Sequence, residues 1–266
     1  MRVLIALRLK GLRVFASART KDALGDLARQ GIETLSIDVT SAPSIEEAKS
    51  EIERLTAGSL DLLVNNAGRN YTVPALDIDM AEVQTTFETN IFAVMRMCQA
   101  FSPLLIKAKG TIVQLGSLAG TMPYVYGSVY NATKAALHSY SDTLRIELAP
   151  FDVKVVVIVA GGVTSRIARV DRELVAGSLY TPVSDEYLRR VKHSQEGAMP
   201  TDSFARSVVN QVLKSSPKRW FWQGSNVWKA WFINSFLPRG VWDFVFWRIF
   251  KLDKLAKAHS NSKKTL

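Results

Sequence analysis

The sequence predicts an α/β fold in which helices cover both faces of a doubly wound parallel sheet. Short apolar runs rich in β-branched residues alternate, along the first two-thirds of the chain, with stretches whose apolar residues recur at helical spacing. The short runs are apolar almost throughout, which is typical of strands covered on both faces. Strict alternation of strands and helices favours parallel strands joined by helical crossovers.

Five strands are expected in this part of the chain, with helices between them. The strands are predicted at residues 13–17, 34–38, 60–65, 111–116 and 154–160, and two long helices at residues 81–107 and 129–148. Shorter helices are predicted around residues 23–27 and 45–55. Ser44, with Glu47 three residues later, has the spacing of a capping box and predicts where the second short helix begins.

The pattern changes after Gly162. Residues 163–200 are more polar and lack strand signals, whereas residues 201–266 indicate a helix, a short strand, two aromatic helices and a basic tail. No linker rich in glycine, serine or proline separates the two parts. We therefore predict a sheet domain over residues 1–215 and, over residues 216–266, an aromatic, basic C-terminal extension of the same domain.

Composition excludes several classes of protein. The 266 residues are 47% hydrophobic and 22% charged, which is typical of a globular protein and not of a disordered one. The single cysteine, Cys98, rules out an intramolecular disulfide, and the three widely spaced histidines make a metal site unexpected. We expect His138 to be a packing or surface residue. No signal peptide or membrane-spanning segment is predicted, because charged residues follow or interrupt the apolar runs.

Tyr130 and Lys134 are the first pair that indicates chemistry. They lie four residues apart on a predicted helix and therefore share one face. An ammonium group beside a phenol favours the phenolate, so we expect Lys134 to lower the pKa of Tyr130. Ser117 follows a strand, at the carboxyl edge where open α/β sheets place their sites, and its hydroxyl is suited to hold a substrate oxygen. Taken alone, a Tyr-x-x-x-Lys pair more often belongs to a helix surface.

Four motifs occur in order along the chain. They are Asn65-Asn66-Ala67-Gly68 after a strand, Asn90 in a helix, Gly116-Ser117 after the next strand, and Tyr130-Asn131-Ala132-Thr133-Lys134 at the start of a helix. In that order and spacing, about residues 12–215 resemble the short-chain dehydrogenase/reductase family. The resemblance implies a Rossmann-like fold and hydride transfer between a nicotinamide cofactor and a carbonyl group.

The resemblance also implies roles for individual residues. Tyr130 would be the general acid in carbonyl reduction, and Lys134 would lower its pKa and hold the nicotinamide ribose. Ser117 would orient the carbonyl, and Asn90 would maintain a proton relay through water. The implied cofactor-binding residues are Tyr130 and Lys134, with Asp38 and Val39 beside the adenine, Asn66 near the adenine ribose, and Val163 and Ser165 beside the nicotinamide amide.

Arg19 bears on the choice of cofactor. It follows the strand at residues 13–17, where family members that use NAD place an acidic residue on the ribose hydroxyls. An arginine there suits the 2′-phosphate of NADPH, so NADPH is the expected cofactor. The alternative interpretation is an ordinary solvated arginine. No metal ion is expected.

The beginning of the sequence departs from the family pattern. The family starts with a strand and a Thr-Gly-x-x-x-Gly-x-Gly turn, which approaches the cofactor pyrophosphate at a helix N-terminus. Here the first glycine is Gly11, and residues 5–10 match only the end of the helix after that turn. We therefore expect the central strand to be absent, or residues 1–7 to replace it poorly, and NADPH to bind weakly. The favoured interpretation is a truncated form of an active reductase, because the downstream motifs are intact; the other is a real variant with impaired cofactor binding.

The C-terminal extension is unusually aromatic. All six tryptophans lie between Trp220 and Trp247, and Trp228, Phe232 and Phe236 share a helical stripe with Trp231. Tryptophans with flanking lysines and arginines favour contact with a membrane surface through residues 225–266. The alternatives are packing over the substrate pocket and a dimer contact. Nucleic acid is not expected as a partner, because the charges surround an apolar surface and lack a binding motif.

Within the family, this extension and the segment Gly116-Ser117-Leu118-Ala119-Gly120 resemble fungal 1-acyldihydroxyacetone phosphate reductases. The resemblance implies NADPH-dependent reduction of a ketone on a lipid-like substrate, at the endoplasmic reticulum or lipid droplet surface inside the cell. Two alternatives stay open: a reductase of a secondary-metabolite or steroid-like ketone, and a catalytically impaired, membrane-associated variant. A cytosolic location and a homo-oligomer are also compatible with the sequence.

Overall fold

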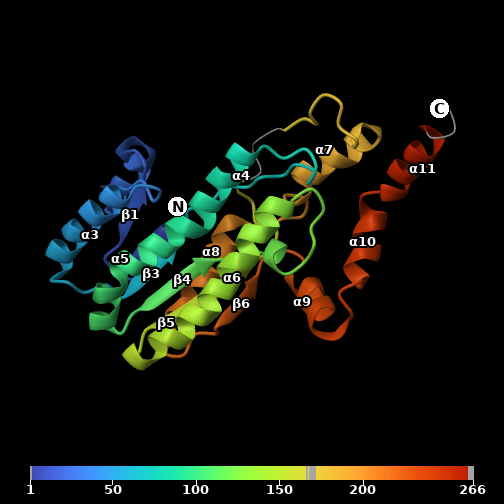
Figure 1. The fold of residues 1–266 in the computed structure, drawn as a ribbon. Helices are drawn as coiled ribbons and strands as arrows, with labels where there is room; N and C mark the ends of the chain where they lie inside the picture. The colour runs from blue at the N-terminus through green and yellow to red at the C-terminus, as the bar shows by residue number, and fades with distance from the viewer. Residues whose placement is uncertain (1, 166, 168–171, 263–266) are drawn as a thin grey trace.

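The protein is described from a computed structural model, which covers residues 2–165, 167 and 172–262 (Figure 1). In chain order the helices and strands are α1 (Arg2–Leu9), β1 (Phe15–Ala18), α2 (Gly25–Ala28), β2 (Glu33–Ser36), α3 (Ala42–Thr56), β3 (Leu62–Asn65), α4 (Met80–Phe87), the π-helical turn η2 (Glu88–Phe92), α5 (Ala93–Ala108), β4 (Thr111–Leu115), α6 (Ser128–Leu148), β5 (Lys154–Ala160), α7 (Ser184–His193), α8 (Thr201–Val212), β6 (Trp220–Gln223), α9 (Val227–Phe236), α10 (Val241–Ile249) and α11 (Leu252–Ser262). Short 3-10 turns lie at η1 (Lys21–Leu24), η3 (Leu118–Gly120), η4 (Ala149–Phe151) and η5 (Thr181–Val183). The predicted α/β fold with parallel strands is confirmed.

The parallel strands form two separate sheets. One contains β1 and β2, and the other has the order β3-β4-β5-β6. Across the described ranges, no strand joins β1 to β3, which is where the family places its first strand. The segment Arg2–Leu9 is a helix and does not act as a substitute strand. The predicted absence of the central strand is therefore seen as a break in the sheet, and residues 5–9 are helical as expected.

Helices bridge this break on both faces. On one face, Phe15 of β1 and Leu35 of β2 pack against a buried cluster that includes Phe101 of α5 and Ile112 of β4. On the other face, α1 packs beside α8, and Leu7 joins a cluster with residues of β1 and α8. Side-chain packing, and not strand pairing, connects the two sheets.

Two helix boundaries differ from the sequence-based prediction. Ser41, and not Ser44, caps α3, because its side chain accepts a hydrogen bond from the Ser44 backbone N–H. The Ser44 hydroxyl instead accepts from the Asp38 backbone N–H at 3.0 Å, so the predicted capping box is wrong. The helix predicted at residues 81–107 is interrupted by the π-helical turn η2 between α4 and α5.

One helical stretch in the described chain, residues 80–108, is long and apolar enough to cross a membrane by length and composition alone. Its α5 part contributes Met97, Phe101, Leu104 and Leu105 to the largest buried cluster. Core helices of folded domains meet the same criteria, so this observation is weak evidence for a membrane span.

The C-terminal extension has one buried and one exposed side. Strand β6 pairs with β5 and continues the larger sheet. Trp242, Phe246 and Phe250 pack with Val157 and Val159 of β5 in one buried cluster. The exposed side carries large aromatic side chains of α9 and α10, namely Trp228, Trp231, Phe232, Phe236, Phe244 and Trp247; we name this set the aromatic face. Helices α9 and α10 stand at the end of the molecule beside β6 (Figure 1).

Candidate active site

The four predicted catalytic residues come from three elements near the carboxyl ends of β3 and β4. Ser117 follows β4, Tyr130 and Lys134 lie on α6, and Asn90 lies in η2. The Ser117 side chain lies close enough to the Tyr130 hydroxyl to act on its pKa. Sequence reasoning therefore brought together residues that the fold does place in one site.

The pKa shifts of Lys134 and Tyr130 differ from the expectation. Lys134 is only 5% exposed, and its Nζ donates to the Leu115 carbonyl oxygen at 2.8 Å while lying 5.8 Å from the centre of the Tyr130 ring. Burial lowers the pKa of Lys134 to about 8. The pKa of Tyr130 is raised by burial, and the effects of Ser117 and Arg190 oppose this shift only in part. The expected lowering by Lys134 is not seen, and Tyr130 is a neutral phenol that retains a proton to donate.

Asn90 acts as a structural brace in this site. Its side chain is buried, its Oδ1 accepts from the Arg69 backbone N–H at 2.9 Å, and its Nδ2 donates to the Arg69 carbonyl at 2.9 Å and to Thr133 Oγ1 at 3.0 Å. These bonds tie η2 to the segment after β3 and to α6. The proton relay that the resemblance implies for Asn90 stays a prediction.

His138 is a neighbour of Ser117 that sequence reasoning did not connect to the site. Its buried ring accepts a hydrogen bond at Nε2 from the Ser117 backbone N–H at 3.3 Å and lies 4.9 Å from the Trp220 ring, centre to centre. A Cβ at Gly116 would lie 2.4 Å from the same nitrogen, so this close approach requires glycine. Burial lowers the pKa of His138 to about 4. The sequence feature that could have connected His138 to the site is its position four residues after Lys134, on the same helix face as Tyr130.

Comparison with known proteins identifies the family. A family model described as short chain dehydrogenase matches residues 3–174. The chain belongs to the short-chain dehydrogenase family. The Aspergillus ruber protein "Short-chain dehydrogenase fogD" is 43% identical over 257 residues, with 96% of this chain and 90% of that protein covered. The Saccharomyces cerevisiae "NADPH-dependent 1-acyldihydroxyacetone phosphate reductase" is 36% identical over 262 residues, covering 96% and 88%.

Solved structures share the fold of this short-chain dehydrogenase. A short-chain dehydrogenase from Streptomyces avermitilis superimposes with a TM-score of 0.77 at 23% identity, covering 97% of this chain and 93% of that one. A Burkholderia cenocepacia short chain dehydrogenase in complex with NADP gives a TM-score of 0.67 at 24% identity, covering 88% and 87%. Membership makes the chain an oxidoreductase of a family that uses nicotinamide dinucleotides.

The residues predicted to bind the adenine end of the dehydrogenase's cofactor lie at the ends of β1, β2 and β3. Arg19 follows β1 and is exposed, and Asp38 follows β2. The pKa of Asp38 is lowered, first by hydrogen bonds from Thr40 and to a smaller degree by the charge of Arg19. Val39 packs against the main core, and Asn66 is exposed directly after β3. Arg19 and Asp38 therefore place opposite charges after two neighbouring strands.

The remaining part of the cofactor site is only partly present. Val163 lies after β5, where it bridges to Met199, and the backbone N–H of Ser165 donates to Gln195 Oε1 at 3.0 Å. Lys134 Nζ lies 3.9 Å from where a Cβ on Gly68 would be, so this amine is next to a backbone without a side chain. No glycine-rich turn joins a strand to a helix N-terminus between the two sheets in the part of the chain that is described. The residues fit both ends of a dinucleotide but not its pyrophosphate.

Arg190 of α7 is a second residue that sequence reasoning missed. It is 4% exposed, its Nε donates to the Val125 carbonyl oxygen at 2.8 Å, and its guanidinium carbon lies 3.3 Å from the centre of the Tyr124 ring. The segment at residues 163–200 carries no sequence signature that marks one arginine among several. Only the tertiary contacts distinguish it.

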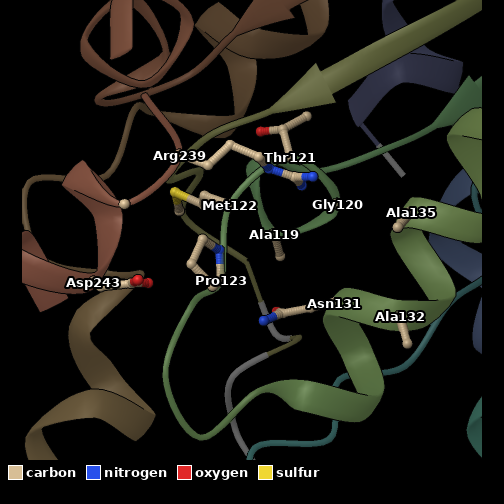
Figure 2. Close-up of a pocket in the computed structure, with 11 residues that line it drawn as sticks. Ala119, Gly120, Thr121, Met122, Pro123, Asn131, Ala132, Ala135, Arg239 and Asp243 are labelled. Carbon is tan, nitrogen blue, oxygen red and sulfur yellow. The ribbon is translucent and has the colours of Figure 1, made fainter. Parts of the chain in front are cut away.

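A pocket lies beside the site and is walled in part by the C-terminal extension. It has a volume of about 370 Å³ and is lined by Ala119, Gly120, Thr121, Met122, Pro123, Asn131, Ala132, Ala135, Arg239, Gly240 and Asp243. Figure 2 shows Arg239 alongside the segment that follows Ser117, with Asn131 and Ala135 on the facing helix α6. The turn before α10 therefore contributes to the surroundings of the active site.

Proposed function

We propose that this short-chain dehydrogenase reduces a ketone on a lipid-like substrate of the acyldihydroxyacetone phosphate type, with NADPH as the reductant. The observation that carries the proposal is the placement of Ser117, Tyr130 and buried Lys134 together at the carboxyl edge of the sheet. Arg19 near Asp38 supports NADPH, as do the names of the yeast relatives. The adjacent pocket and aromatic face support an apolar substrate.

The roles of the side chains follow from their protonation states. NADPH supplies a hydride to the carbonyl carbon when it is bound. Tyr130, a neutral phenol, donates its proton to the carbonyl oxygen, and Ser117 donates a hydrogen bond that holds this oxygen in place. Lys134 stabilises the negative charge that remains on Tyr130 and would hold the nicotinamide ribose. The product is a secondary alcohol.

NADPH oxidation in the presence of a short-chain 1-acyldihydroxyacetone phosphate tests the proposal. We expect turnover by the wild-type chain at high NADPH and a loss of at least about 100-fold in kcat for Tyr130→Phe, because the proton donor is removed. NADH in place of NADPH is the control for the cofactor. Equal use of both cofactors would contradict the role of Arg19, and equal rates with and without the Tyr130 hydroxyl would contradict the mechanism.

A second candidate function is reduction of another ketone, such as a secondary metabolite. It is favoured by the relatives from Aspergillus ruber and Hypocrea virens, named short-chain dehydrogenases, which are 43% and 42% identical to this chain. Turnover of an apolar ketone without a phosphate, and none of the acylated phosphate, would favour this candidate. Absence of turnover with every ketone would favour an impaired variant.

We expect NADPH to bind this chain weakly. The residues at the two ends of the cofactor would contribute contacts, but the helix N-terminus that normally binds the pyrophosphate is not among the described elements between β1 and β3. Titration of intrinsic fluorescence with NADPH measures this directly. A submicromolar dissociation constant would contradict the expectation.

We also propose that the aromatic face contacts an anionic membrane surface, such as the endoplasmic reticulum or a lipid droplet. Trp228 is 68% exposed and Phe236 63% exposed, and the exposed Arg239 and Arg248 border them. Exposed aromatic rings beside cations are typical of interfacial contact. Arg248 also lies over the Phe244 ring, 4.8 Å from its centre.

Flotation with liposomes that contain phosphatidylserine tests the membrane contact. Deleting residues 225–266 would remove buried Trp242 and Phe250 and damage the core, so substitutions are preferable. We expect Trp228→Ser, Phe232→Ser and Phe236→Ser together to abolish flotation. The matched control carries Leu76→Ser, Ile146→Ser and Leu179→Ser, which remove equally exposed apolar side chains elsewhere. Equal flotation of both variants would end the proposal.

A further inference from the structure

Arg190 is a buried cation whose charge no carboxylate balances within the described residues. No Asp or Glu oxygen of these residues lies within 4.0 Å of its guanidinium nitrogens, whereas other half-buried arginines, such as Arg69 and Arg172, pair with Glu82. Burying a cation without a paired anion is energetically unfavourable. Its hydrogen bond to Val125 and its stacking on Tyr124 use one N–H and one face of the group. The other guanidinium N–H groups are therefore donors suited to a ligand.

The guanidinium reaches the first turn of the helix that carries Tyr130. Gly127 is the residue directly before α6. A Cβ added to Gly127 would lie 3.1 Å from Arg190 Nη2. No side chain caps this helix, and its first turn contains no acidic residue. A helix N-terminus carries a partial positive charge, so two unbalanced positive groups are neighbours here. The charge of Arg190 also acts on Tyr130.

Asn131 provides an independent observation at the same place. Its Oδ1 lies 3.0 Å from the same Cβ position on Gly127, is buried, and accepts no hydrogen bond. Its Nδ2 is held by the Tyr124 carbonyl oxygen at 2.9 Å, which fixes the orientation of the amide. Buried polar atoms without a partner are rare and are typical of groups that a ligand satisfies. Asn131 also lines the pocket beside the active site (Figure 2).

We propose that Arg190 binds a phosphate monoester group of the ketone substrate, next to Tyr130, with the uncapped N-terminus of α6 as the second donor and Asn131 Oδ1 accepting the P–OH of the singly protonated phosphate. The planar guanidinium donates pairs of hydrogen bonds to phosphate oxygens, and helix N-termini bind the same group. This inference rests on the proposed function, because it concerns the substrate of the same site. It specifies a phosphate as the part of the substrate that is recognised by charge.

Calorimetric titration without cofactor tests this inference separately from catalysis. The two ligands are hexanoyl dihydroxyacetone phosphate and hexanoyl dihydroxyacetone, which differ only in the phosphate. For Arg190→Met we expect an affinity loss of at least about tenfold for the phosphate ligand and a change below about twofold for the neutral one. Arg190→Lys keeps the charge and should retain part of the phosphate affinity.

Arg189→Met is the matched control, because Arg189 lies on the same helix, is exposed, and donates to the Ile249 carbonyl. It should bind both ligands as the wild-type chain does. Unchanged phosphate affinity in Arg190→Met would overturn the inference while leaving the proposed reduction intact. An equal loss of both ligands would also overturn it, since Arg190 would then act only through the fold. If the wild-type chain binds neither ketone, the inference and the proposed function both fail.

Discussion

At the scale of single residues, His138 shows how one buried side chain sets the position of a catalytic group. Its ring fills a space that Gly116 and Gly120 leave open, and its Nε2 receives the backbone N–H of Ser117. Only a neutral imidazole can accept this bond, because both ring nitrogens of the protonated form are donors. The position of Ser117 therefore depends on His138 being deprotonated.

The pH dependence of stability tests this role. The folded-state pKa of about 4 is below the ordinary value of 6.5, so between these pH values the unfolded chain takes up a proton that the folded chain does not. As the pH falls through this window the fold loses stability, by about 2 kcal/mol between pH 7 and pH 5 for this one group. Urea unfolding of the wild type and of His138→Gln, which keeps an acceptor, should differ by this amount in their pH dependence. The same pH dependence in both proteins would contradict the assignment.

At the scale of elements, the π-helical turn η2 connects three parts of the site. It places Asn90 where one side chain bonds the segment after β3 and the helix α6 at once. A regular helix over residues 80–108 would rotate Asn90 relative to these partners, since a π-turn changes the helical phase. The interruption of the predicted long helix is therefore a feature of the site.

Asn90→Ala tests the importance of this turn. The substitution removes three hydrogen bonds and leaves backbone groups of Arg69 without partners, so we expect a loss of about 2 to 3 kcal/mol in the free energy of unfolding. Thr89→Ala is the control, because the Thr89 hydroxyl bonds only within the helix, to the Thr85 carbonyl. It should cost less than about 1 kcal/mol in the same urea titration. A loss for Asn90→Ala no larger than that of the control would refute the bracing role.

At the scale of the whole molecule, the break between the two sheets divides the fold into unequal parts. The larger sheet has β4 and β5 paired on both sides, whereas the β1–β2 sheet has only one pair of strands. An isolated two-stranded sheet is marginally stable, so β1 and β2 depend on packing against α1, α3 and α8. The part that would bind the adenosine is thus held more weakly than the part that carries Tyr130.

Hydrogen exchange should reveal this difference. We expect hydrogen-bonded amides of β1 and β2, such as that of Glu33, which donates to the Val14 carbonyl oxygen, to exchange at least about tenfold faster than those at the centre of β4 and β5. The edge strand β3 is the control for exposure at a sheet edge. Equal protection of both sheets would show that packing alone replaces the strand pairing.

The site residues that could be predicted are those whose signal lies within a short segment of the sequence. Tyr130 and Lys134 are recognisable from spacing on one helix, and Ser117 from its position after a strand. The failed expectation concerned the pKa of Tyr130, which depends on how far burial outweighs neighbouring charges. Arg190 comes from α7, far along the chain, and nothing in its neighbouring residues indicates that it reaches the start of α6.

The sequence by itself determined the strands, the approximate positions of most helices, the parallel direction of the strands and the family, because hydrophobic period and ordered motifs are properties of short segments. It also indicated that no strand of the described residues joins β1 to β3, since an absent motif can be read directly. Only the tertiary structure decided that helix packing bridges the break between the two sheets. It also decided that one side of the aromatic extension is buried and the other exposed. Finally, it placed His138 beside Ser117 and Arg190 at the start of α6. These features depend on contacts between distant segments, whose geometry and burial no local pattern encodes.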